Sequence, residues 1–486
     1  MGKSVLVTSS IQSRSILLNF PFKNKGQTMK YKLIAISTLF LTLALTVTAV
    51  AETAEMKQPT PTKTLTLAEY KTMLEKGVPI EFVRRAKKLF SMRHFTADAL
   101  DHKESAEDDA LYYSTFMWEF LPSAVVPASK TKFDLPRALN PALGDVTFSD
   151  LKGKIHPTLK TFLDSPESKI QGLMMIHKGK VVYETYPGMR PTDKHIWMSV
   201  TKPLTGTLVL DLIMQGKMDP NASITKYVPE LKGSAWDGVT LQSVLNMTTG
   251  LNADDISGNM YKADTMEQRY YQASFGDLYK GKKENWLDVI RESKKIAEPY
   301  TLYQYASLNT QVLSIAVENV TQKKFVDYLY ERLLQYAGTS EMVVNLFPDG
   351  SIQAATAMNS TLEDLGRYGL LYTPTFKKLT GKEVISQKLI DQMFATKVPI
   401  EIFAPSAVGQ AANELLGNQT VSGSGSQFDF LWKDGAFAKT GHNSQGLYID
   451  PAREFVGVYF GVSLVPNYPI GYMRAVALSL DKKDVE

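Results

Sequence analysis

Two side chains that could carry out acyl transfer, Ser199 and Lys202, lie three residues apart in the sequence. A serine hydroxyl is a poor nucleophile at neutral pH until a base removes its proton. A lysine can be that base if burial or a neighbouring cation lowers its pKa from an ordinary value of about 10.4. The spacing puts both side chains on one side of a helix. Taken alone, however, the pair favours a simpler interpretation, in which the serine caps a helix beside a solvated lysine.

The residues after this pair predict a buried helix that begins close to it. Pro203 is tolerated in the first turn of a helix but not in its interior. The run 204–214 is apolar nearly all round, which is typical of a buried helix. We therefore expect Ser199 at the N-terminal mouth of this helix, where unpaired N–H groups and the helix dipole favour negative charge.

A second proton-transferring group is expected, because Lys202 cannot easily both activate the serine and protonate a leaving group. Tyr305 and Ser307 precede an apolar helical run over 309–320. A tyrosine between two ammonium groups would have a pKa below its ordinary value of about 10. Ser307 would orient the lysine or a substrate. The alternative is a core tyrosine that happens to precede a helix.

A third motif, Lys439-Thr440-Gly441, ends a predicted strand and is followed by His442. Acyl transfer needs a positive field and N–H donors for the developing oxyanion. Gly441 permits close approach of a substrate backbone, and the N–H of His442 could point into the site. The alternative is a surface strand that carries an exposed lysine.

The N-terminal segment predicts export. From Met29, a short basic region, an apolar run over 33–47 and a small-x-small site at 49–51 follow in the order of a signal peptide, which we assign to 29–51. Residues 1–28 lie upstream of it, so we interpret Met29 as the true start. The apolar run is shorter than the roughly 20 residues of a membrane span, which makes a membrane anchor the weaker alternative. We expect a periplasmic or secreted protein.

Composition narrows the function classes. The chain has 486 residues, no cysteine, a hydrophobic share of 44% and a formal net charge of +4. Six lysines and arginines and no acidic residues lie within 1–51, so the rest of the chain has a net charge of −2. Nothing then indicates nucleic-acid binding, which needs a basic face. The absence of cysteine excludes disulfides and thiolate chemistry.

The pattern of apolar residues predicts an α/β (α+β) domain over 151–486, preceded by a linker over 52–64 and a mainly helical extension over 65–150. We expect this extension to pack on the larger domain, and the alternative is a small independent domain. A β-hairpin is expected over 172–186 and two further strands at 446–449 and 455–460. Helices lie between these strands, so one antiparallel sheet should be built from both ends of the domain, flanked by helices and a helical subdomain. The helical segments that we expect here are 241–251, 286–296, 309–320, 361–371 with a capping box of Thr361 and Asp364, and 471–482.

The order Ser-x-x-Lys, Tyr-x-Ser and Lys-Thr-Gly resembles the serine β-lactamase and penicillin-binding-protein superfamily. The resemblance covers roughly residues 150–480 and is nearest to the class C-like branch, which includes esterases, D-aminopeptidases and 6-aminohexanoate-dimer hydrolases. Further stretches that carry it are 197–202, 227–236, 245–250 and 445–451. The stretch 227–250 and Tyr-x-Ser are similar to the aminohexanoate-dimer hydrolases, whereas Lys-Thr-Gly is similar to the lactamases.

The resemblance implies a β-lactamase/transpeptidase-like fold and a role for each matching residue. Ser199 would be acylated, and Lys202 and Tyr305 would together take and return its proton. The backbone N–H groups of Ser199 and His442 would form the oxyanion hole.

Substrate binding would fall to Ser307, Lys439, Thr440 and Gly441. The tyrosines of the segment that can cover the site in such hydrolases would be Tyr261, Tyr270 and Tyr271, although they could equally be loop aromatics that pack on the body.

The sequence shows no other pattern of catalytic, metal-binding or phosphate-binding residues. The six histidines show no metal-ligand spacing, no Gly-x-Ser-x-Gly elbow surrounds Ser199, and no Gly-rich phosphate loop occurs, so we expect neither a metal nor a cofactor. We expect a serine hydrolase (carboxylesterase or amidase) that acts on a small ester, amide or lactam. The rivals are a β-lactamase or D,D-peptidase and a non-catalytic binding module. An intact Ser199, Lys202 and Tyr305 argues against the last.

Overall fold

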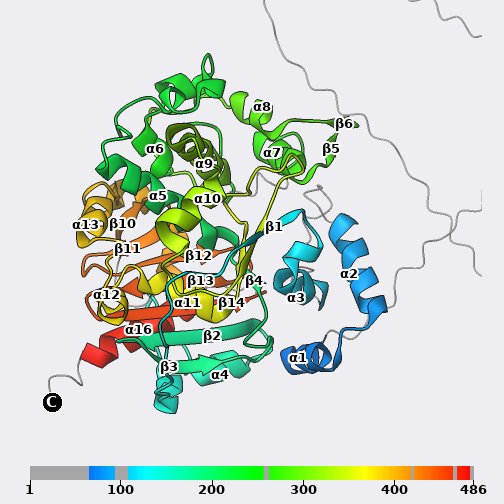
Figure 1. The fold of residues 1–486 in the computed structure, drawn as a ribbon, viewed down its shortest axis with the longest axis vertical. Coiled ribbons are helices and arrows are strands. Elements are labelled where there is room, and N and C mark those ends of the chain that lie inside the picture. Colours follow the sequence, from blue (N-terminus) through cyan, green and yellow to red (C-terminus); the bar gives the residue numbers. More distant parts are fainter. Residues whose placement is uncertain (1–64, 93–107, 257–261, 417–420, 463–467, 482–486) are drawn as a thin grey trace, which may run out of the picture. The chain divides into compact units, whose positions relative to one another are not determined.

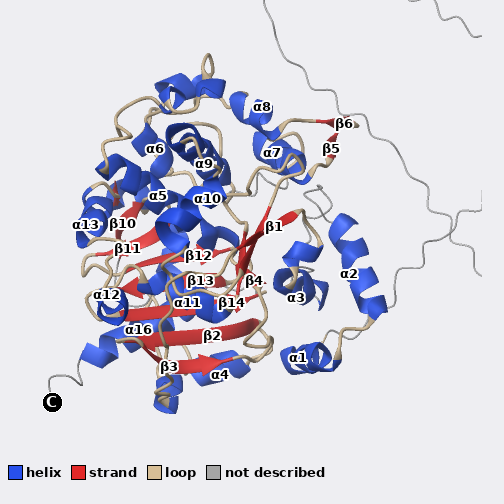
Figure 2. Ribbon diagram, viewed as in Figure 1, coloured by secondary structure: helices blue, strands red, loops and turns tan. Residues whose placement is uncertain are grey.

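The central sheet joins strands from both ends of the predicted domain, as expected from the sequence. The computed structural model describes residues 65–92, 108–256, 262–416, 421–462 and 468–481. Eight antiparallel strands pair in the order β3-β2-β14-β13-β12-β11-β10-β9 (Figures 1 and 2). Their bounds are β2 (Ile170–His177), β3 (Lys180–Thr185), β9 (Val398–Pro399), β10 (Val421–Gly425), β11 (Phe428–Trp432), β12 (Phe437–Gly441), β13 (Gln445–Asp450) and β14 (Phe455–Gly461).

Helices cover both faces of this sheet, because its strands are apolar on both sides. Side chains alternate across a strand, and β14 is buried throughout. Val456 and Val458 face helix α11 (Leu362–Leu370), where Gly366 and Gly369 allow close packing. Gly457, on the opposite face, lies against helix α16 (Pro469–Asp481). The sheet is therefore the middle layer of three, and its core is continuous with the helical subdomain.

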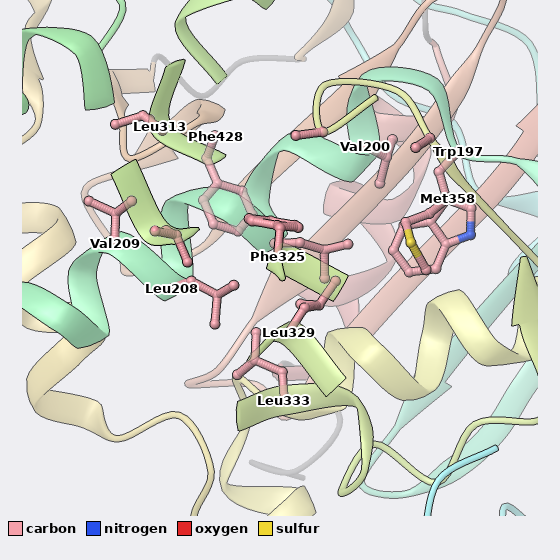
Figure 3. Packing of buried hydrophobic residues seen from close by; sticks show 14 of the residues in the cluster. Trp197, Val200, Leu208, Val209, Leu313, Phe325, Leu329, Leu333, Met358 and Phe428 are labelled. Atoms are coloured by element: carbon pink, nitrogen blue, oxygen red, sulfur yellow. The ribbon is translucent and has the colours of Figure 1, made fainter. Parts of the chain in front are cut away.

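The helical subdomain is organised around α5 (Lys202–Met214), the helix predicted after Ser199. Its side chains are buried nearly all round, and it contacts α9 (Ser307–Thr321), α13 (Gln387–Ala395) and β11. Figure 3 shows the apolar side chains of α5 among residues from α9, α10 (Phe325–Leu329) and β11. Further helices here are α6 (Leu241–Leu245), α7 (Met266–Phe275) and α8 (Trp286–Arg291). By contrast, α12 (Pro374–Thr380) contacts α11, and α14 (Ile400–Phe403), which precedes α15 (Ala407–Leu415), contacts β9 and β10.

A four-stranded sheet leads the chain into the Ser199 region. Its order is β1-β7-β8-β4, with β1 (Ser123–Val126), β4 (His195–Ile196), β7 (Met342–Asn345) and β8 (Met358–Ser360). A separate hairpin pairs β5 (Leu278–Tyr279) with β6 (Lys282–Lys283). Because β4 ends at Ile196, the pairing of β4 with β8 fixes where the turn that carries Ser199 begins.

The extension supplies three helices, α1 (Leu67–Lys76), α2 (Ile80–Met92) and α3 (Asp108–Thr115), and the short α4 (Leu159–Asp164) precedes β2. The described residues of the extension belong to the same compact unit as the rest of the described chain. Nζ of Lys71 donates to the carbonyl of Tyr186 at 2.9 Å, and Arg190 donates to the carbonyl of Leu74 at 3.0 Å. The predicted signal peptide and linker lie outside the described residues.

Several helices differ in length from the prediction. The helix expected over 241–251 ends at Leu245, because Met247 and Gly250 both have a positive φ, which a helix cannot contain. The helix expected over 286–296 ends at Arg291. The capping box of Thr361 and Asp364 is present as predicted.

Candidate active site

Ser199 lies in a tight turn held rigidly by its neighbours. The 3-10 turn Met198–Thr201 separates β4 from α5, and Met198 has a φ of +48°, a conformation that a side chain of this kind rarely adopts. Trp197 is fully buried; its backbone N–H donates to the carbonyl of Met358 at 2.7 Å and its indole N–H to Oγ of Ser360 at 2.8 Å. The strained residue immediately before Ser199 is thus over-determined by packing, which is a common feature of functional turns.

The simpler interpretation of the Ser199 and Lys202 pair is wrong. Thr201 precedes α5 in helical conformation, and no side chain caps the helix. Lys202 is completely buried rather than solvated. The pair therefore has no capping or surface role, and both polar groups need another explanation.

The Lys202 amine is surrounded by three oxygen atoms. Nζ lies 3.0 Å from Oγ of Ser199, 2.9 Å from Oγ of Ser307 and 3.2 Å from the carbonyl oxygen of Ala355. A carbonyl oxygen only accepts, so Ala355 fixes one N–H, and Ser307 accepts a second. The protonated amine donates its third N–H to Oγ of Ser199. In the neutral amine, which has two N–H groups and one lone pair, the lone pair takes that place and faces the Ser199 hydroxyl.

The electrostatics of the site favour that neutral form near physiological pH. Burial, followed by repulsion from Lys439, lowers the pKa of Lys202 to about 7, while Asp255 and Asp429 oppose the shift. The unprotonated form of Lys202 is therefore accessible near neutral pH. A lysine in this state has a lone pair available to remove a proton from Ser199.

Tyr305 lies between the two lysines, as the sequence argument required. Nζ of Lys202 is 5.0 Å and Nζ of Lys439 is 4.7 Å from its ring centre, and Lys439 donates to its hydroxyl at 2.9 Å. The predicted direction of its pKa shift is wrong, however. Burial and then the charge of Asp429 raise the pKa of Tyr305, and only a weaker interaction with the Ser199 hydroxyl lowers it. Tyr305 therefore rests as the neutral phenol, able to donate a proton.

Ser307 is the first residue of α9, two residues earlier than the predicted helix start. Its backbone N–H donates to Oδ2 of Asp255 at 2.7 Å, and the hydroxyl of Tyr271 donates to the same oxygen at 3.0 Å. Asp255 is buried, and a carboxylate at a helix N-terminus is stabilised by the helix dipole. Asp255 thereby holds the start of α9 in register with Lys202.

Lys439 is also buried rather than exposed, so the alternative interpretation of its motif as a surface strand is wrong. Its Nζ lies 2.7 Å from Oδ1 of Asp429 and 2.8 Å from the carbonyl oxygen of Thr440. The backbone N–H and the hydroxyl of Thr440 both donate to Oδ2 of Asp429, at 2.9 and 2.7 Å. Burial lowers the pKa of Lys439, and Asp429 opposes that shift.

The end of β12 approaches the Ser199 turn closely because Gly441 has no side chain. A Cβ at this position would lie 3.0 Å from the carbonyl oxygen of Trp197 and 3.2 Å from Cβ of Met198. The next residue, His442, is exposed and opens the hairpin turn between β12 and β13. The residue after the Lys-Thr-Gly motif is thus brought next to the turn that carries Ser199.

A pocket adjoins the Lys202 site on the side of Ser307 and Ala355. Its lining is aromatic and uncharged, with Tyr270, Tyr271, Phe275, Phe347, Gln311, Gln353, Ser274 and Thr356 as further residues. Of the three tyrosines expected to cover the site, Tyr270 and Tyr271 line this pocket, and Tyr261 lies outside the described residues.

The sequence argument missed Asp255, Asp429 and the carbonyl of Ala355. Asp429 left a signal, because it interrupts the apolar run of β11 between Phe428 and Phe430, where a buried charge needs a partner. Asp255 and Ala355 left none, since both reach the site from irregular segments far away in sequence.

Within the described ranges, no group of three or more histidine, cysteine or acidic side chains is placed to hold a metal ion. No helix among these residues is long and apolar enough to cross a membrane.

The chain is similar to one family model and to several known proteins. A family model described as Beta-lactamase matches residues 165–474. The 6-aminohexanoate-dimer hydrolase of Paenarthrobacter ureafaciens is 29% identical over 244 residues, which cover 47% of this chain and 58% of that protein. Protein flp of Staphylococcus aureus (strain MW2) is 24% identical over 151 residues, which cover 30% of this chain and 27% of that protein. The chain thus spans less than two thirds of the length of these relatives.

A solved structure from Bacillus anthracis, described as a candidate 6-aminohexanoate-dimer hydrolase, shares this fold. It superposes with a TM-score of 0.62 at 23% identity and covers 78% of this chain and 96% of its own. The predicted fold class, an antiparallel sheet flanked by helices with a helical subdomain, is confirmed.

Proposed function

Because the chain belongs to the Beta-lactamase family, we propose that it is a serine hydrolase that cleaves an ester or amide bond through an acyl-enzyme on Ser199. Family membership confirms the resemblance drawn from the three motifs. The observation that carries the proposal is the 3.0 Å contact between Nζ of Lys202 and Oγ of Ser199, with the amine held by two further oxygens.

In the proposed reaction, the lone pair of Lys202 takes the Ser199 proton as Oγ forms a bond to the substrate carbonyl carbon. The tetrahedral intermediate collapses when the bond to the leaving alcohol or amine breaks and the leaving group takes a proton from Tyr305. The proton that Lys202 took from Ser199 then passes to the Tyr305 phenolate, so that both groups return to their starting states. Water attacks the acyl-enzyme in the same way and releases the acid and free Ser199.

We assign the oxyanion hole to the backbone N–H groups of Ser199 and His442. The close approach of Gly441 to the Ser199 turn supports this pairing, because it brings the residue after Gly441 beside the nucleophile. Two preorganised N–H donors stabilise a developing oxyanion strongly in a site that excludes water.

An amide substrate is supported by the curated relative named for hydrolysis of an aminohexanoate dimer, although this chain spans only 58% of that protein. A β-lactamase or D,D-peptidase is the second candidate, and the Lys439-Thr440-Gly441 motif favours it. A non-catalytic binding role would not require a buried Lys202 with its amine hydrogen-bonded to three oxygen atoms.

We also retain export as a proposal, on the basic, apolar and small-residue order within 29–51. Expression with and without this segment, followed by fractionation and N-terminal sequencing of the product, tests it. Retention of the intact N-terminus in the cytoplasm would contradict export.

The test of the proposed function is covalent labelling followed by turnover. The full chain is incubated with a fluorophosphonate, with benzylpenicillin and with 4-nitrophenyl acetate and butyrate, and the adducts are mapped by mass spectrometry. We expect fluorophosphonate on Ser199 and release of 4-nitrophenol. Benzylpenicillin that labels Ser199 and is rapidly released would instead favour the lactamase, and the absence of any Ser199 adduct would contradict a serine hydrolase.

A further inference from the structure

Lys439 and Thr440, the two residues of the strand-end motif whose side chains could receive a negatively charged substrate, have no side-chain hydrogen-bond donor left to offer. An ammonium group has three N–H donors, and the contacts of Lys439 use all three: the hydroxyl of Tyr305 at 2.9 Å, Oδ1 of Asp429 at 2.7 Å and the carbonyl of Thr440 at 2.8 Å. The side chain of Lys439 is about 1% exposed. No part of this ammonium group is available to a ligand.

Thr440 is tied to the same carboxylate. Its hydroxyl has one hydrogen, which goes to Oδ2 of Asp429 at 2.7 Å, and its backbone N–H goes to the same oxygen at 2.9 Å. Asp429 therefore accepts from both polar residues of the motif. A substrate carboxylate at this strand end would lie near the Asp429 carboxylate and would find the side-chain donors of Lys439 and Thr440 already used.

The position of Asp429 follows from the sheet itself. On the antiparallel pair β11 and β12, Phe430 lies opposite Ala438 and Leu431 lies opposite Phe437. One step further in the same register places Asp429 opposite Lys439, as a cross-strand ion pair with both side chains buried. The arrangement is built into the core of the sheet and does not depend on a surface side chain.

The Lys439–Asp429 ion pair also carries no net charge, because the ammonium and the carboxylate offset each other. Lys202 is only partly protonated near pH 7, and the other titratable group buried next to the site, Asp255, is an acid. A buried site without net positive charge disfavours an incoming anion, because the anion loses its hydration without gaining a counter-charge.

Building on the proposed hydrolase, we infer that Asp429 is a specificity-determining residue that restricts this site to esters and amides lacking a carboxylate near the scissile bond. Lys439 is then a positioning residue for Tyr305 rather than an anchor for a substrate carboxylate. The same arrangement weighs against penicillin-type substrates, which carry such a carboxylate.

The variant Asp429→Asn separates these roles with little change in shape. The amide oxygen of asparagine still accepts from Lys439, but its NH2 group cannot accept from Thr440. The Thr440 hydroxyl and N–H are released from their charged acceptor, and the strand end loses the negative charge of Asp429. A carboxylate-bearing substrate should therefore be accepted better by the variant than by the wild-type protein.

The experiment compares 4-nitrophenyl valerate with mono-4-nitrophenyl glutarate, which have acyl chains of equal carbon number and differ in a terminal carboxylate. Values of kcat/KM are measured at pH 8 for the wild-type protein, Asp429→Asn and the control Glu331→Gln. Glu331 is a half-exposed carboxylate paired with Lys323 on the surface, so the control removes one negative charge outside the proposed site.

We expect the wild-type protein to prefer the valerate by about tenfold or more, Asp429→Asn to reduce this ratio by about tenfold through a lower KM for the glutarate, and Glu331→Gln to leave it unchanged. Equal wild-type rates for the two esters, or an unchanged ratio in Asp429→Asn, would overturn the inference while leaving the hydrolase intact. Failure of both esters to acylate Ser199 of the wild-type protein would overturn the proposed hydrolase and this inference with it.

Discussion

Nζ of Lys202 and Oγ of Ser199 lie 3.0 Å apart inside the protein, and two further oxygens hold the amine in place. The lysine is fully buried and the serine is about 8% exposed. The nucleophile is therefore at the surface of the site and its base is behind it.

Hydrolysis should depend on the protonation of Lys202. Burial lowers its pKa to about 7, and only the neutral amine can take the Ser199 proton. The value of kcat/KM should therefore rise about tenfold per pH unit below pH 7 and level off above it. A profile of 4-nitrophenyl butyrate hydrolysis between pH 5 and 9 measures this. A flat profile across that range would contradict Lys202 as the base.

Replacing Lys202 by arginine should abolish most of the activity while keeping a positive side chain. A guanidinium stays protonated throughout the accessible pH range and cannot serve as the base. We expect kcat to fall by about 10²- to 10⁴-fold, with no recovery at high pH. Single-turnover acylation measures the effect, and circular dichroism checks the fold. Near wild-type acylation by the variant would mean that another group activates Ser199.

Removing the Tyr305 hydroxyl should slow proton return without removing the ring between the lysines. In Tyr305→Phe, the apolar packing persists, but Lys439 loses one acceptor and the leaving group loses its proton donor. We expect a loss of about 10²-fold or more in kcat for amides. The loss should be smaller for 4-nitrophenyl esters, whose leaving group needs no proton. An equal loss for both substrate types would argue that Tyr305 is only structural.

The carboxylate of Asp255 should set the pH range of the reaction. Its negative charge favours protonated Lys202, so removing the charge lowers the pKa of Lys202 further. In Asp255→Asn, the rising limb of the pH profile should move to lower pH. Tyr271→Phe removes one hydrogen bond to Asp255 but keeps the charge, and it should leave the limb in place. Identical profiles for Asp255→Asn and the wild-type protein would contradict this electrostatic role.

The chemistry-bearing residues were predictable where they form local patterns. The spacing of Ser199 and Lys202, the proline that opens α5 and the strand that ends in Gly441 all follow from short stretches of sequence. The two-ended sheet followed from the order of apolar patterns. These features depend on periodicity and turn chemistry, which a single sequence contains.

The rest depends on contacts between distant segments. The pKa of Tyr305 was predicted to fall because two lysines were expected beside it, and both are there. The prediction failed because burial dominates the pKa of Tyr305, and because Asp429, on a strand more than a hundred residues away, offsets the charge of Lys439. The helix expected to continue to residue 251 likewise stops at Leu245, where the chain turns through the positive φ of Met247.

The most direct test of the account is acylation of Ser199 itself. The wild-type protein, Ser199→Ala and Lys202→Arg are each incubated with a fluorophosphonate and with 4-nitrophenyl butyrate, and peptide mass spectrometry locates any adduct. We predict a stoichiometric adduct on Ser199 of the wild-type protein, none on a Ser199→Ala variant that melts within a few degrees of it, and a greatly slowed adduct in Lys202→Arg. A wild-type protein that hydrolyses the ester with Ser199 unlabelled, or a Ser199→Ala variant that retains activity, would contradict the account.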